Sequence, residues 1–194
     1  MRKFFMPNNI YAFISLYVIP IFTILIASKL SWTESNLSII GNYYDSQKEL
    51  FIWGILVAFF ILFFMHNIFD RISYKDLLSE VFLYGVCLLI LLAVTTPYLP
   101  DQFPVKSKFH EGFAFFIPIV FSFLIFRFLR FLHNMDRKYF MIFWIYLLII
   151  VIISIMMLSR HGYVTSLLEI FITLSICYFI RFLDIKISDY ISKD

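Results

Sequence analysis

The sequence has few charged residues: Asp, Glu, Lys and Arg make up 15% of its 194 positions, whereas soluble domains contain roughly 25%. Hydrophobic residues make up 62%, above the roughly 45–50% of ordinary soluble proteins. The low charge excludes a soluble globular protein, and the high hydrophobicity excludes intrinsic disorder. The same composition leaves no room for a water-soluble catalytic domain beside a membrane part.

Cysteine and glycine are also scarce. The two cysteines, Cys87 and Cys177, lie in long apolar runs, so a disulfide framework is not expected. There is no glycine-rich phosphate loop, no paired cysteines at metal spacing and no Gly-x-Ser-x-Gly elbow. We expect no cofactor. The net charge of +3 is explained by membrane topology and anionic headgroups, so no nucleic-acid partner is expected.

Six apolar runs are long enough for membrane-spanning helices, which need about 20 residues. No period of two runs through them, and a helix satisfies its own backbone in lipid, so we predict an all-α, six-span bundle forming one domain over residues 1–194. Two interior prolines, Pro20 and Pro118, are expected to mark kinks. The predicted spans are Tyr11–Leu30, Phe51–Phe69, Leu78–Pro97, Gly112–Leu132, Tyr139–Leu158 and Val164–Leu183.

Lys and Arg divide unevenly between the two sets of connections. Eleven, beginning with Arg2 and Lys3, lie on the side of the termini and five on the other, which predicts cytoplasmic termini. The first apolar run is too long for a signal peptide, and Ile26–Lys29 is not a convincing cleavage site, so we expect a retained span. Abundant Phe and Ile with little Ala or Gly favour a bacterial protein of the plasma membrane.

Glu169 is the clearest candidate functional residue, because an ionisable group inside a membrane is costly. It belongs to a polar stripe at steps of four on the sixth span, which we expect to face the bundle interior. One interpretation is an acid that binds a cation, a lipid headgroup or a proton. The other is a buried carboxylate that pairs with Arg160, His161 or a loop lysine and fixes helix packing.

Further polar candidates gather in the connections on the same, predicted outer, side. A zinc-type site is one interpretation of the two histidines with their carboxylate neighbours, but His110-Glu111 has no second histidine at i+4. Plain contacts with lipid headgroups are the alternative, and no metal is expected. The residues concerned are Asp101, His110, Glu111, Arg160 and His161.

The outer segment Leu37–Asn42 contains Gly41 and Asn42, a pair that favours a tight turn. We expect a structural turn that covers the outer mouth of the bundle. Ser38 in this segment has an alternative role as a nucleophile, with His110 or His161 as its base.

The predicted inner side carries ordinary interfacial charges. Arg127, Arg130 and His133 are expected to extend to the cytoplasmic headgroups. Asp76 and Glu80, at i and i+4, are expected to be solvated.

Three short motifs occur together in this chain: Leu37-Ser38-x-x-Gly41-Asn42 before a span with Trp53-Gly54, Pro100-Asp101-x-Phe103-Pro104 leading to His110, and Thr165-Ser166-x-x-Glu169. In combination they resemble the DRAM/FRAG-like six-span membrane proteins and their bacterial relatives. The resemblance implies a multi-pass protein whose polar residues gather near the non-cytoplasmic side. It implies no established catalytic activity.

Three functions are compatible with the sequence. The first is a non-enzymatic accessory protein that binds membrane lipids, a membrane-protein partner or a second copy of itself through a polar pocket near the outer face. The second is an outer-face hydrolase that uses His110, His161 and a carboxylate, with or without metal. The third is a small proton-coupled transporter in which Glu169 titrates. The pocket candidates are Glu169, His110, His161, Asp101, Glu111, Arg160, Ser38 and Asn42.

Overall fold

The computed structural model describes residues 8–43 and 46–193. Arg2 and Lys3, which contribute to the predicted charge bias, lie outside this part. Every regular element within it is a helix, so the predicted all-α class is confirmed. The elements are α1 (Asn8–Phe13), η1 (Ile14–Val18), α2 (Ile19–Ala27), α3 (Leu37–Tyr43), α4 (Gln47–Arg71), α5 (Leu77–Thr95), α6 (Pro104–Met135), α7 (Arg137–His161) and α8 (Ser166–Ile191).

Six helical segments are long and apolar enough to cross a membrane, as predicted. The first is Ile10–Ala27, which joins α1, η1 and α2, and the others are α4 to α8. Most helices extend beyond the predicted spans, and α6 reaches 32 residues. The prediction stopped at charged residues, but a helix continues past a bilayer surface wherever its backbone remains hydrogen-bonded.

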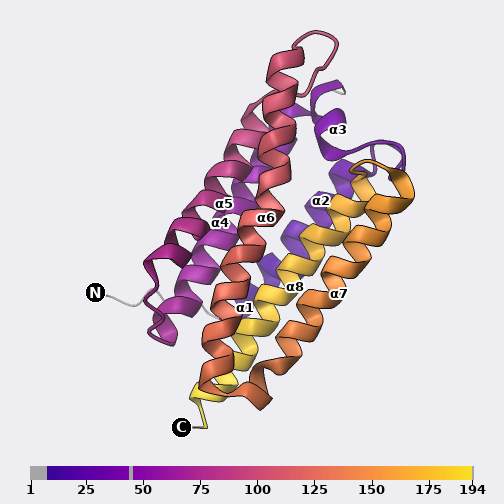
Figure 1. Ribbon diagram of the computed structural model, residues 1–194. Coiled ribbons are helices and arrows are strands. Elements are labelled where there is room, and N and C mark those ends of the chain that lie inside the picture. Colours follow the sequence, from indigo (N-terminus) through magenta and orange to yellow (C-terminus); the bar gives the residue numbers. More distant parts are fainter. Residues whose placement is uncertain (1–7, 44–45, 194) are drawn as a thin grey trace.

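The bundle has two distinct ends. Helix α1 begins and α8 ends at one of them, the terminal end, and α3 lies at the other, the α3 end (Figure 1). Helices α4, α5 and α6 lie side by side, while α2, α7 and α8 form the other side of the molecule (Figure 1). At the terminal end, α6 and α7 are joined directly through Asp136, which caps α7 by accepting a hydrogen bond from Tyr139 N (2.9 Å).

The first span is not a continuous α-helix. A π-helical segment, η1, separates α1 from α2, and Pro20 is the second residue of α2. Proline has no N–H and cannot donate to the carbonyl four residues earlier, which favours a local change in the hydrogen-bond pattern. Pro118, by contrast, lies inside α6, and the helix continues on both sides of it.

The expected turn at Gly41-Asn42 is wrong, because this segment forms α3. Asn42 Nδ2 donates to the Ser38 carbonyl, 2.7 Å away and one turn earlier, and supports the helix. Gly41 serves a close approach instead: a Cβ at this position would lie 2.5 Å from Leu50 Cδ2. Glycine is therefore needed where α3 packs against α4.

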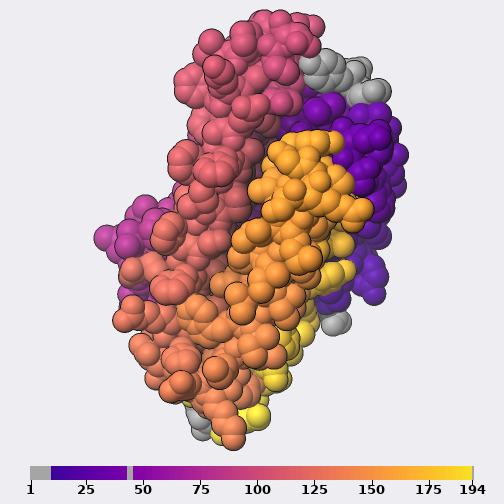
Figure 2. Space-filling view, turned by 45° about the vertical axis from the view of Figure 1, so that its right-hand side comes forward, coloured from indigo at the N-terminus to yellow at the C-terminus, as the bar shows by residue number. Residues whose placement is uncertain are grey.

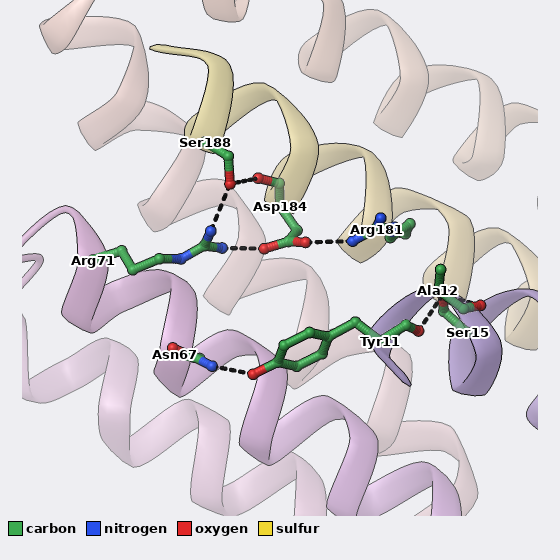
Figure 3. A network of polar contacts seen from close by, with 8 residues as sticks. All are labelled: Tyr11, Ala12, Ser15, Asn67, Arg71, Arg181, Asp184 and Ser188. Atoms are coloured by element: carbon green, nitrogen blue, oxygen red, sulfur yellow. Dashed lines mark hydrogen bonds and ion pairs between the residues drawn. The ribbon is translucent and has the colours of Figure 1, made fainter. Parts of the chain in front are cut away.

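A buried polar network joins α4 to α8 near the terminal end (Figure 3). Asp184 is buried and accepts from Arg71 of α4 and from Arg181 Nη1 (2.6 Å). Arg71 Nη1 also donates to Ser188 Oγ, 2.7 Å away. Arg181 lies three steps of four after Glu169, on the polar stripe predicted for the sixth span. Its partner Asp184 was not among the predicted candidates.

Replacing Asp184 by Asn should destabilise the protein strongly. The change would leave two largely buried guanidinium groups, 17% and 15% exposed, without a counter-charge, which costs about 3–5 kcal/mol. We expect a clear fall of Tm in detergent solution. Asp189→Asn is the matched control, because Asp189 is exposed on the same helix and should leave Tm unchanged. Equal Tm values for Asp184→Asn and the wild type would contradict this role.

Asp76 links α5 to α6 just outside the spans. It caps α5 by accepting from Ser79 N (3.1 Å) and binds the Arg127 guanidinium through Nε (2.9 Å) and Nη2 (2.8 Å). Arg127 therefore forms a two-point ion pair, which corrects the expectation that it extends freely to headgroups. The Arg127 guanidinium holds the pKa of the Asp76 carboxyl well below its ordinary value, and the hydrogen bonds from Ser79 lower this pKa further.

This ion pair predicts a pH-dependent stability. Because the pKa of Asp76 is lower in the folded protein, its contribution is fully present above the ordinary carboxyl pKa of about 3.9 and declines as pH falls below it. Asp76→Asn should lower Tm at pH 7 by about 2–4 °C, as expected for the loss of about 1 kcal/mol. The difference from the wild type should shrink at pH 3, whereas Asp70→Asn, a control at an exposed position, should have little effect at pH 7. A difference that stays constant between pH 7 and pH 3 would exclude the ion pair as its source.

Candidate functional site

A large cavity lies in the half of the bundle next to the α3 end. Its volume is about 1040 Å³, at the upper end of the range for small-molecule sites. Side chains from α3, α4, α5, α6, α7 and α8 line it, and most of them are apolar. The polar lining residues are Asn36, Ser38, Tyr98, Lys108, His110, Glu111, Ser154, Tyr163, Glu169 and Thr173.

The cavity opens sideways between α6 and α7. Phe115 of α6 and Ile155 and Leu158 of α7 line it and are 65%, 58% and 42% exposed. Figure 2 shows the hollow between these two helices in the upper half of the molecule. Since both helices are long enough to span a membrane, the opening faces the direction from which bilayer lipid would enter.

Helix α3 and the segment before it are fixed to the start of α8 by several hydrogen bonds. Glu169 Oε2 accepts from Leu37 N (2.7 Å), Ser166 N donates to the Ser35 carbonyl (2.6 Å), and Leu167 N donates to the Trp32 carbonyl (2.9 Å). The first N–H groups of a helix have no partner within it, so α8 uses them to hold this segment. The result places Ser38 on the cavity wall.

His110 of α6 is buried and joins α5, α6 and α3. Its Nδ1 lies 2.8 Å from the Ala93 carbonyl and 2.9 Å from the Thr96 carbonyl, and its Nε2 lies 2.7 Å from Ser38 Oγ. Pro97 explains the free Ala93 carbonyl, because proline has no N–H to continue the ladder of α5. Carbonyls only accept, so Nδ1 carries the proton, and Nε2 of the neutral ring accepts from the Ser38 hydroxyl.

Glu169 lies half-buried in the cavity wall, on the same stripe of α8 as Thr173 and Cys177, which also line the cavity. The expected pairing with Arg160, His161 or a loop lysine is wrong, because the partner of Glu169 is the Leu37 backbone. Among the described residues, nothing donates to its other oxygen, Oε1. That oxygen remains an available hydrogen-bond acceptor.

The other predicted site residues lie further out. Glu111 is exposed and lines the cavity, whereas Asp101 and Arg160 are exposed and do not line it. His161 ends α7 next to Tyr163, with ring centroids 6.5 Å apart, away from the cavity lining. Asn42 supports α3 through Ser38 rather than lining the cavity. The structure thus brings Ser38, His110, Glu111 and Glu169 to one cavity and leaves the other four outside its wall.

A shared metal site is not formed by these groups. Within the part of the chain that the structure describes, no three His, Cys, Asp or Glu side chains are placed to hold a metal ion. His110, the buried histidine, already uses both ring nitrogens.

Ser154 is a cavity residue that the sequence analysis missed. It lines the cavity from α7, and its buried Oγ has no hydrogen-bond partner among the described residues. A signal was present, because Ser154 is the only polar residue in the apolar stretch 147–158.

Comparison with models of protein families, with curated proteins and with solved structures found no match for this chain. The resemblance to the DRAM/FRAG-like proteins therefore stays a prediction from the sequence motifs.

Proposed function

We propose that this chain is a multi-pass protein of a bacterial plasma membrane that binds a membrane lipid in the cavity. The observation that carries the proposal is the sideways opening between α6 and α7 into an apolar chamber with polar groups at one end. A binding site for an amphiphile needs an apolar region that lipid can enter and a polar region at its end. The acyl chains would lie in the apolar part and the headgroup at the α3 end.

The polar lining indicates which headgroup fits. Lys108 supplies a positive charge, and Glu111 and Glu169 supply two carboxylates. The free oxygen of Glu169 accepts hydrogen bonds, and the ammonium of Lys108 pairs with an anion. A zwitterionic glycerophospholipid, which carries both a phosphate and an ammonium group, matches this set.

The opening provides a direct test. Ile155→Trp should narrow the entrance and displace acyl chain from it, so labelling of the purified protein by photoreactive, alkyne-tagged phosphatidylethanolamine in vesicles should fall. Losing the contacts of one apolar side chain costs about 1.5–3 kcal/mol, or roughly 10- to 150-fold in affinity.

Ile152→Trp is the matched control. Ile152 is similarly exposed on α7 but does not line the cavity, so its replacement should leave labelling at the wild-type level. Equal labelling of the wild type and both variants, with no competition by untagged lipid, would show that lipid contacts only the outer surface and would refute the proposal.

A further inference from the structure

We propose that Ser38 and His110 form a nucleophile and general base that cleave an ester bond of a lipid held in the cavity. The substrate class rests on the proposed lipid binding, but the reactivity of Ser38 does not. The two residues are 72 positions apart in sequence and meet at 2.7 Å through Ser38 Oγ and His110 Nε2. This distance lies within the range for direct proton transfer to a general base.

The surroundings of His110 orient it for this role. In serine hydrolases a third group accepts a hydrogen bond from Nδ1–H and keeps Nε2 free to take the serine proton. Here the Ala93 and Thr96 carbonyls occupy that position, at 2.8 and 2.9 Å. They are positioning groups and stay neutral throughout.

Access to the nucleophile is also built in. Ser38 is half-buried and lines the cavity, whereas His110 behind it is only 4% exposed. An ester that enters between α6 and α7 with its headgroup toward the α3 end reaches Ser38 first. A purely structural hydrogen bond between α3 and α6 would not require Ser38 to line a chamber of this size.

The reaction balances with water as the second substrate. Ser38 Oγ bonds to the ester carbonyl carbon while its proton moves to His110 Nε2. The bond from carbon to the alkoxy oxygen breaks, and the leaving alcohol takes that proton. Water then attacks the acyl-serine, gives a proton to Nε2 and forms the fatty acid, and Ser38 Oγ recovers its proton from Nε2.

The full-length protein in detergent, treated with a small alkyl fluorophosphonate, tests the assignment. Ser38 Oγ should displace fluoride, and peptide mass spectrometry should find the phosphonate on Ser38. Ser38→Ala should abolish this adduct, and His110→Gln should slow labelling by at least about 100-fold, as expected for loss of a general base. Ser159→Ala, which removes an exposed serine of α7 outside the cavity lining, should label at the wild-type rate.

The outcomes separate this proposal from lipid binding. Folded wild-type protein without phosphonate on Ser38 would overturn the nucleophile, whatever the variants do, even if the photoreactive lipid binds. Labelling of Ser38 that persists in folded His110→Gln would overturn the base. Phosphonate on Ser38 together with failed lipid labelling would support the dyad and refute the lipid as its ligand.

Discussion

The architecture of the α3 end depends on the hydrogen bonds of one buried imidazole. His110 satisfies two carbonyls at the end of α5 through Nδ1 and holds α3 through Nε2. Unpaired polar groups are costly in a region with little water. His110 of α6 therefore connects the end of α5, where Pro97 leaves a carbonyl free, to Ser38 of α3. Ser38 and His110 form part of the cavity wall.

The two ends of the bundle handle charge differently. Near the terminal end, Asp184 is enclosed by two guanidinium groups and joins α4 to α8, which suits a rigid contact. At the α3 end, Glu169 is bound by a single backbone N–H and keeps one oxygen available toward the cavity. The ion pairs of Asp184 thus hold α4 against α8, whereas the cavity lies beside the singly bound Glu169. This difference places the candidate site in one half of the molecule.

Much of the fold was predictable from sequence, because hydropathy and helix length are local properties. The site was predictable as a set of residues and as a pairing of Ser38 with either His110 or His161, but the sequence did not decide between the two histidines. Ser38 and His110 were both candidates, but their contact depends on α3, whose Gly-Asn pair indicated a turn, whereas Gly41 instead allows close packing on Leu50. Asp184 was missed because it follows directly after the last predicted span, Val164–Leu183.

The tautomer of His110 tests the central claim most directly, by ¹⁵N NMR of histidine-labelled protein with His110→Gln as the assignment control. The structure predicts a proton on Nδ1, an unprotonated Nε2, and an Nε2 resonance that shifts in Ser38→Ala. A proton on Nε2, or an Nε2 resonance unaffected by Ser38→Ala, would contradict the arrangement of α3, α5 and α6 described above.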